Sequence, residues 1–154
     1  MEIFEVQRLH IQGVSVRTRN ADEADPERAC IGALWADFAV QVAPRLAKGA
    51  VTYGVYHHYE SDANGAYDLL AGSDALEKNE QTAAQPWQGV TIGAGSYAVF
   101  QVSGAMPQAV MAAWGRVWAY FADPHCPYQR AYTTDFERYG PDGSVEIFIA
   151  LAAS

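Results

Sequence analysis

The chain has 154 residues, of which 50% are hydrophobic and 18% are charged, so one folded domain spanning residues 1–154 is expected. The net charge of −8 argues against nucleic-acid binding, because it repels phosphate backbones, and favours cationic ligands. No segment approaches the roughly 20 apolar residues that cross a bilayer, and the N-terminus is charged throughout. We therefore expect a cytoplasmic protein with no membrane partner. Cys30 and Cys126 are expected to be free thiols, with a single bridge between them as the alternative.

The first half of the chain predicts a strand, a helix and two further strands. Residues 8–19 alternate loosely between polar and apolar side chains, as in a strand. Asp25 as N-cap, Pro26 in the first helical position and Glu27 in the first turn indicate a helix start. This helix should end near Pro44 and bury an apolar stripe, namely Ile31, Leu34, Trp35, Phe38 and Val42. Two strands should follow in residues 51–61 and 66–72, joined by Asp-Ala-Asn-Gly.

The same order of elements recurs in the second half. Residues 89–104 predict a strand, Pro107 should open a helix, and residues 128–139 and 144–151 predict two strands joined by Gly-Pro-Asp-Gly. Trp35 aligns with Trp114 and Gly65 with Gly143, at offsets that differ by one residue. The sequence therefore predicts an internal repeat of residues 8–74 and 88–152, joined by the polar segment 75–87.

Turn chemistry predicts the sheet face on which Glu137 lies. Pro141 and Gly143 occupy the second and fourth positions of a turn that suits a three-residue hairpin loop with a bulge. In that register Glu137 lies opposite Ile147 and shares the inner face of its strand. A two-residue turn, the alternative, would place Glu137 on the outer face.

The same reasoning applied to residues 62–65 places Tyr59 opposite Leu69, with His57 and Tyr67 on the same inner face. Both Gly65 and Gly143 are then expected to have positive φ.

An inward carboxylate is costly to bury unless a partner neutralises it. The structural alternative for Glu137 is a pair with Arg130, Arg138 or a tyrosine hydroxyl, and the functional one is a counter-charge for a cationic ligand. Trp35, Trp114 and Trp118 fit either a plain core or a wall on which flat cations stack.

No cofactor and no metal are expected. His57 and His58 are adjacent on a predicted strand, where successive side chains point to opposite faces, so they should be unable to share an ion. No nucleotide-binding or hydrolase motif occurs in the sequence.

Three segments carry a family resemblance: YGVYHHYESDANGAYDLLAG, AGSYAVFQVSGAMPQAVMAAWGRVWAYF and DFERY. They resemble the GyrI-like small-molecule-binding family, which includes the effector-binding domains of AraC-type and multidrug-sensing regulators. The resemblance covers the chain from about residue 8 to its C-terminus. It implies an α+β fold of two strand-helix-strand-strand modules related by a pseudo-twofold axis. These modules would form an antiparallel sheet with two long helices on one face and a ligand groove between them.

The acidic residue of the family's Phe-Glu-x-Tyr segment corresponds to Glu137, which the resemblance implies binds cations. With the aromatic residues above, the predicted ligand-binding set is Glu137, Tyr59, Trp35, Phe38, Trp114, Trp118, Tyr139 and His57. Nothing before residue 8 is long enough for a helix-turn-helix module. The chain is therefore similar to the stand-alone members found in integron gene cassettes.

We expect a binding protein that senses or sequesters small lipophilic organic cations, and not an enzyme. A separate regulatory protein is a further expected partner. One alternative is a hydrolase of small reactive electrophiles that uses Glu137 as general base and Tyr59 as donor. A second is an inhibitor that docks on another protein through its acidic surface.

Overall fold

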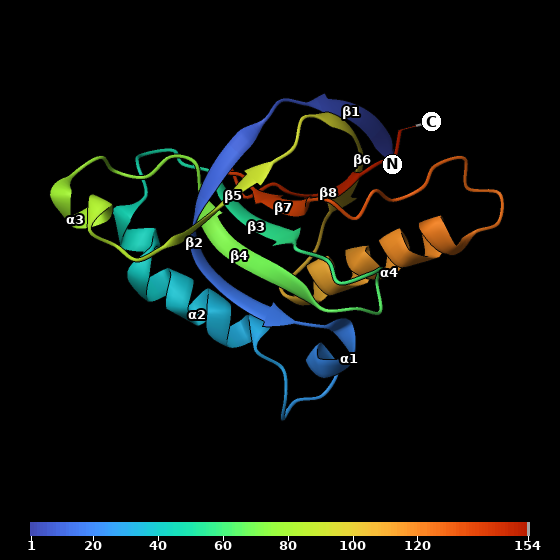
Figure 1. The fold of residues 1–154 in the computed structure, drawn as a ribbon, viewed down its shortest axis with the longest axis horizontal. Helices are drawn as coiled ribbons and strands as arrows, with labels where there is room; N and C mark the ends of the chain where they lie inside the picture. The colour runs from blue at the N-terminus through green and yellow to red at the C-terminus, as the bar shows by residue number, and fades with distance from the viewer. Residues whose placement is uncertain (154) are drawn as a thin grey trace.

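The computed structural model describes residues 1–153, which form an antiparallel sheet of eight strands and four α-helices (Figure 1). The strands are β1 (Glu2–Val6), β2 (Leu9–Thr18), β3 (Thr52–His57), β4 (Tyr67–Ser73), β5 (Gln88–Ile92), β6 (Gly95–Val102), β7 (Asp135–Tyr139) and β8 (Val145–Ala150). Their order in the sheet is β1-β6-β8-β7-β3-β4-β2-β5. The helices are α1 (Asn20–Glu23), α2 (Ile31–Gln41), α3 (Glu80–Ala83) and α4 (Gln108–Ala122). The predicted α+β class with an antiparallel sheet is confirmed.

The sheet contains more strands than the sequence predicts. Strand β1 was not expected, and residues 89–104 form most of two strands instead of one. Strand β5 pairs with β2, whereas β6 pairs with β1 and β8. The alternating pattern breaks at Gly93-Ala94-Gly95, where Gly95 has a φ of 150°, so the chain changes direction between the two strands. Of the strand predicted over residues 128–139, only Asp135–Tyr139 forms a strand, β7.

Helix α2 begins at Ile31, and the prediction of a start near Pro26 is wrong. The Asp25 carboxylate accepts a hydrogen bond from the Glu27 amide at 3.0 Å, which closes a separate turn before the helix. The first amides of α2 donate instead to the carboxylate of Glu23, from Cys30 at 3.1 Å and from Ile31 at 3.1 Å. The cap therefore comes from α1 and not from the residues next to the helix. Helix α4 follows Pro107 directly, as predicted.

The two hairpins differ in how well turn chemistry predicts them. Glu137 lies opposite Ile147, and Gly143 has a φ of 87°, so the predicted register of the β7–β8 hairpin is confirmed. In the β3–β4 hairpin Tyr56, and not Tyr59, lies opposite Leu69, so that prediction is wrong.

Strand β3 ends earlier than predicted because His58 adopts a left-handed φ of 51°. The turn at Asp62–Gly65 does form, with the Gly65 amide donating to the Asp62 carbonyl at 3.2 Å. However, it lies inside a longer loop, and Gly65 is not among the described glycines with positive φ.

The two longer helices bury their apolar stripes against the sheet. Leu34 and Phe38 of α2 pack with Leu69 of β4, and Ala113 and Val117 of α4 pack in a cluster with residues of β6 and β8. A third cluster lies on the other face of the central strands, around Val55 and Phe136. Cys30 and Cys126 are free, as predicted. Among residues 1–153, none of the helices has the length and hydropathy that a membrane span requires.

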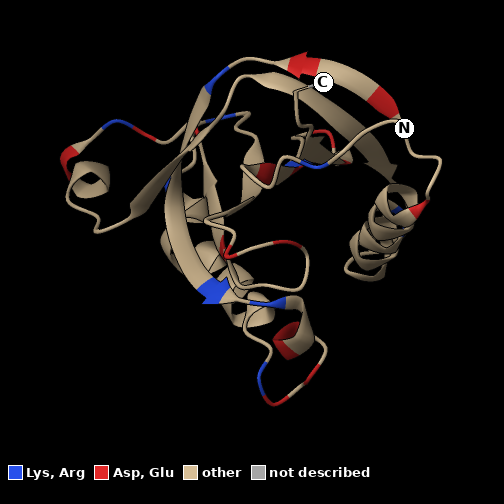
Figure 2. Cartoon of the chain, turned by 45° about the vertical axis from the view of Figure 1, so that its right-hand side comes forward, with Lys and Arg blue, Asp and Glu red and all other residues tan. Residues whose placement is uncertain are grey.

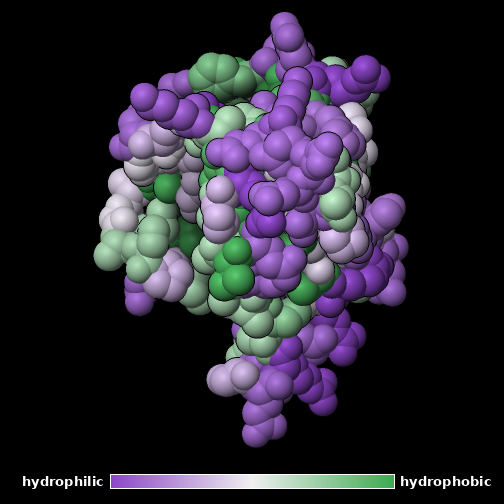
Figure 3. Space-filling view, turned by 90° about the vertical axis from the view of Figure 1, so that its left-hand side faces the viewer, coloured by the Kyte–Doolittle hydropathy of each residue, from purple (hydrophilic) through white to green (hydrophobic). Residues whose placement is uncertain are grey.

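Charged residues lie mainly in loops and near strand ends, whereas α4 carries a single charged residue, Arg116 (Figure 2). The face that carries α3 is mainly hydrophilic, with smaller hydrophobic patches (Figure 3). This polar region contains the segment between β4 and β5, where the sequence predicts a polar connection in residues 75–87.

Gly72 is expected to tolerate no side chain. It pairs with Gly13 of β2 and Tyr53 of β3, and a methyl group there would lie 2.0 Å from the Gln12 carbonyl oxygen. Because backbone and not a flexible side chain is in the way, Gly72→Ala should lower the free energy of unfolding by about 1–3 kcal/mol or more. The matched control is Gly115→Ala in α4, where a methyl group meets nothing within 4 Å. This substitution should raise the free energy of unfolding by up to about 1 kcal/mol. Urea denaturation of both variants measures the difference, and equal stabilities would contradict the close approach of β2 to β4.

Candidate functional site

The Glu137 carboxylate is buried on β7 and is held by three hydrogen-bond donors. Glu137 is only 3% exposed. The Tyr56 hydroxyl and the Trp114 indole N–H donate to Oε2 at 2.8 and 2.7 Å, and the Tyr139 hydroxyl donates to Oε1 at 2.8 Å. The donors come from β3, α4 and β7, so three separate elements meet at one carboxylate.

A glycine makes room for a fourth element at this point. Gly54 of β3 is the residue directly opposite Glu137 on the neighbouring strand. A methyl group at Gly54 would lie 3.1 Å from Glu137 Oε1 and 3.1 Å from the ring of Trp35. The indole of Trp35, from α2, therefore occupies the space that a side chain at Gly54 would fill. It also makes an edge contact with Tyr139 at a ring-centroid distance of 5.5 Å.

Aromatic rings continue from the carboxylate toward the surface of α4. The Tyr56 and Trp114 rings are in edge contact at 4.9 Å, and Trp118 lies 6.3 Å from Trp114. Trp118 is 44% exposed. It lines a pocket of about 490 Å³ together with Phe121 and Tyr132, while Glu137 itself does not line this pocket.

Burial raises the pKa of Glu137 above its ordinary value, and the hydrogen bonds from Trp114, Tyr139 and Tyr56 oppose that rise. Burial and the adjacent Glu137 charge together raise the pKa of Tyr139, so this tyrosine stays a neutral donor. No basic side chain within residues 1–153 forms an ion pair with Glu137, so an arginine partner is not found. The other form of the structural alternative, a tyrosine hydroxyl as partner, is present in both Tyr56 and Tyr139.

Asp135, two residues earlier on β7, is the contrasting case. Arg130 donates to its Oδ2 at 2.7 Å, and Tyr59 donates to the same oxygen at 2.5 Å. Arg130 therefore neutralises Asp135, whereas Glu137 is compensated only by neutral donors.

The predicted site residues divide into two groups. The first group surrounds Glu137: Trp114 and Tyr139 bond to its carboxylate, and Trp35 contacts Tyr139. The Trp118 ring lies beside that of Trp114, and the Phe38 ring lies 5.4 Å from that of Trp35, between ring centroids. Tyr59 packs against the same hydrophobic cluster as Trp35 and Trp114 but does not bond to Glu137, and His57 lies on the other face of the sheet.

The hydrolase alternative requires Glu137 and Tyr59 to reach the same bound atom. The Tyr59 hydroxyl instead donates to Asp135. His57 lies opposite Asp68 and therefore on the other face of β3 from Tyr56. The residue that sequence reasoning missed is Tyr56. A hairpin register shifted so that Tyr56, and not Tyr59, faced Leu69 would have placed it beside Glu137.

Comparisons with known proteins agree on the family and the fold. A family model described as Cass2, integron-associated effector binding protein, matches residues 2–151. The crystal structure of the integron cassette protein VCH_CASS2, from the mobile metagenome of Vibrio cholerae, is 42% identical with a TM-score of 0.88. That match covers 98% of this chain and 95% of that chain.

Two more distant structures share the fold. SAV2435 bound to tetraphenylphosphonium is 19% identical with a TM-score of 0.64, over 99% of this chain and 93% of that one. EcmrR in a complex with DNA is 13% identical with a TM-score of 0.54, over 99% of this chain and 57% of that one. No curated protein matched the sequence. The matches confirm the resemblance that the sequence motifs indicate.

The raised pKa of Glu137 predicts how stability depends on pH. A buried carboxylate with a folded-state pKa above its unfolded value contributes its full stability at low pH and loses it as the pH rises through the folded pKa. Glu137→Gln removes the charge and keeps the shape. From about pH 4 to about pH 8, the free energy of unfolding of the wild type should therefore fall relative to that of the variant. The fall is about 1.4 kcal/mol for each unit by which the pKa is raised. Urea denaturation across this interval measures it, and a wild type that gains stability relative to the variant would show that the pKa is lowered.

Proposed function

Because the chain belongs to the Cass2 family of integron-associated effector binding proteins, we propose that it binds small lipophilic organic cations against the Glu137 carboxylate. The ligand-binding residues in this proposal are Glu137, Tyr56, Tyr139, Trp35, Trp114 and Trp118. Phe38 supports Trp35 from behind, and neither Tyr59 nor His57 is included.

The observation that carries the proposal is the difference between two buried carboxylates on one strand. Asp135 has Arg130 as a counter-ion, whereas Glu137 has only the neutral donors Tyr56, Trp114 and Tyr139. A buried charge without a counter-ion is costly, and its partners can be replaced by a ligand that brings the opposite charge. A bound cation would thus give Glu137 a counter-charge, as Arg130 does for Asp135.

The aromatic residues around Glu137 fit the same class of ligand. Trp35, Tyr56, Trp114 and Tyr139 surround the carboxylate with ring faces and edges. A cation over an aromatic face gains roughly 0.5–2 kcal/mol, most when water is excluded, and apolar substituents of the cation gain from burial. Tetraphenylphosphonium, which is bound in SAV2435, belongs to this class of lipophilic cations.

The pocket beside Trp118 supports a route to the carboxylate. Its volume of about 490 Å³ is within the usual range for ligand sites, and its lining includes the aromatic Trp118, Phe121 and Tyr132 as well as the charged Asp62 and Arg130. Trp118 lies next to Trp114, whose indole bonds to Oε2, so in this proposal a ligand enters beside Trp118 and the Trp114 indole turns away to admit it to Glu137. The ligand then takes the place of the Trp114 hydrogen bond.

We further propose a single domain made of two modules, residues 8–74 and 88–152, related by a pseudo-twofold axis with the groove between α2 and α4. The strand order supports this once β1 is added to the first module. When β1 to β4 are exchanged number by number with β5 to β8 and the order is read backwards, the same sheet results. Trp35 from α2 and Trp114 from α4 both reach the region of Glu137. A separate regulatory protein that responds to the occupied groove is the proposed macromolecular partner.

Glu137→Gln should weaken cation binding selectively. With tetraphenylphosphonium as the probe, loss of the charge-assisted contact should cost about 1.5–3 kcal/mol, which is roughly a tenfold to hundredfold rise in Kd. Triphenylphosphine oxide, a neutral molecule with similar rings, should change far less. Tryptophan fluorescence provides the titration signal, because Trp114 and Trp118 lie in the proposed groove.

Glu27→Gln is the matched control, because Glu27 is exposed and its loss changes the net charge equally. It should leave both affinities unchanged. The proposal fails if the wild type binds no lipophilic cation, or if Glu137→Gln weakens the charged and the neutral probe to the same extent. The second result would mean that the carboxylate only shapes the groove.

A further inference from the structure

The end of strand β3 brings two histidines and an aspartate together on the sheet face away from Glu137. His57 and Asp68 are directly opposite each other on β3 and β4, and directly opposed residues share a face. His58 follows the strand with a φ of 51°, which turns its side chain back, so the two imidazole centroids are only 4.9 Å apart. The expectation that these rings point to opposite faces is wrong for this reason.

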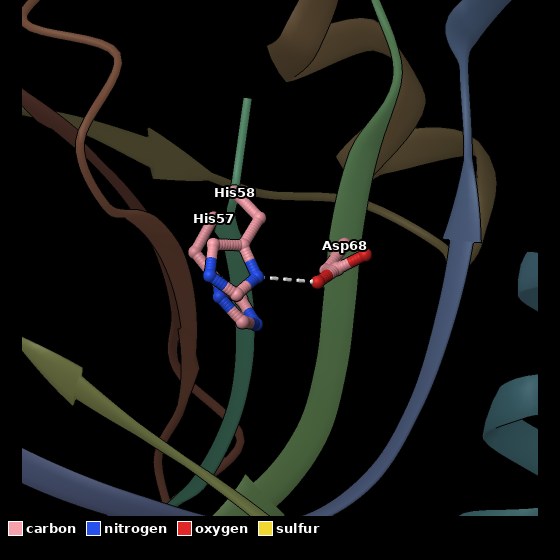
Figure 4. A group of neighbouring side chains, drawn as sticks. All are labelled: His57, His58 and Asp68. Carbon is pink, nitrogen blue, oxygen red and sulfur yellow. Dashed lines mark hydrogen bonds and ion pairs between the residues drawn. The ribbon is translucent and has the colours of Figure 1, made fainter. Parts of the chain in front are cut away.

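Each of these residues offers one ligand atom, and the three atoms lie within 4.8 Å of one another. Figure 4 shows the two imidazole rings side by side, next to Asp68 on the neighbouring strand. His57 is only 8% exposed, and its Nε2 has no hydrogen-bond partner among the described residues. A buried ring nitrogen without a partner is costly, and coordination of an ion would satisfy it.

We propose that His57, His58 and Asp68 bind a divalent transition-metal ion of the Zn²⁺ type, at a site separate from the Glu137 groove. Two imidazole nitrogens with one carboxylate oxygen form a ligand set that Zn²⁺ uses in proteins, with a fourth position left for water or another ligand. Ligand atoms of a tetrahedral zinc site lie about 3.4 Å apart, so the three side chains need only a modest movement to close around the ion. The His58 side chain is 76% exposed and is free to make it.

Arg17 competes for the same carboxylate. Its guanidinium is 3.0 Å from Asp68 Oδ1, while His58 Nδ1 is 2.8 Å from Oδ2. An ion would replace the His58 contact and would be repelled by the Arg17 charge. Because the Arg17 side chain is 47% exposed, it can move into solvent when the ion binds, at a cost to affinity. Removal of this charge should therefore strengthen metal binding.

Titration of the untagged, metal-free protein with Zn²⁺ in a calorimeter tests the proposal. One ion should bind per chain, and Mg²⁺ should not compete, because it prefers oxygen ligands. His58→Gln and Asp68→Asn should each raise the Kd for Zn²⁺ at least tenfold, since even a group behind the ligands is worth about that much. Arg17→Gln should lower the Kd. Circular dichroism confirms that each variant is folded.

His125→Gln and Glu137→Gln are the controls and should leave Zn²⁺ affinity unchanged. The first removes an exposed histidine outside the cluster, and the second separates this site from the proposed cation groove. The proposal is overturned if Zn²⁺ does not bind saturably at one ion per chain. It is also overturned if binding survives both His58→Gln and Asp68→Asn, or if His125→Gln abolishes it. None of these results depends on whether the Glu137 groove binds cations.

Discussion

The hydrogen bonds to the Glu137 carboxylate connect strands β3 and β7 with helix α4 at the centre of this fold. Glu137 lies on β7, which pairs with β3 in the middle of the strand order, and the donors Tyr56, Trp114 and Tyr139 come from β3, α4 and β7. Helix α2 adds Trp35, whose ring fits over Gly54 of the opposite strand. One buried acceptor thus ties α4 to the centre of the sheet, and α2 packs beside it through Trp35.

Under the proposed function, this arrangement trades some stability of the fold for binding of a cation. Three neutral donors compensate the carboxylate only in part, and burial still raises its pKa. A glutamine of the same shape could accept from Tyr56 and Trp114 through its carbonyl oxygen and donate to Tyr139 without burying a charge, so the charge itself needs a reason. An incoming cation would supply it, because its interaction with Glu137 is strongest where water is excluded. The ion pair between Arg130 and Asp135 shows that the same strand holds a neutralised carboxylate two residues away.

Local sequence was enough to predict Glu137 on the inner face, because the glycine at 143 and the proline before it determine the turn and hence the register. It was not enough for the other hairpin. There a turn forms as predicted, but the left-handed conformation of His58 ends β3 early, so Tyr56 takes the place expected for Tyr59. The predicted start of α2 was wrong for a related reason. The helix is capped by a carboxylate from the preceding segment, and no residue next to the helix indicates this cap. Local turn chemistry thus determines a turn, while contacts made elsewhere determine where a strand or helix ends.

Proton release on ligand binding tests the central claim most directly. Because burial raises the pKa of Glu137, a fraction of the carboxylate is protonated in mildly acidic solution, and a bound cation favours the ionised form. Calorimetric titration with tetraphenylphosphonium near pH 5–6, in buffers of different ionisation enthalpy, counts the protons exchanged. The account predicts that the wild type releases protons and that this release disappears in Glu137→Gln. Cation binding by the wild type without proton release, or an equal release from the variant, would show that Glu137 does not receive the cation's charge.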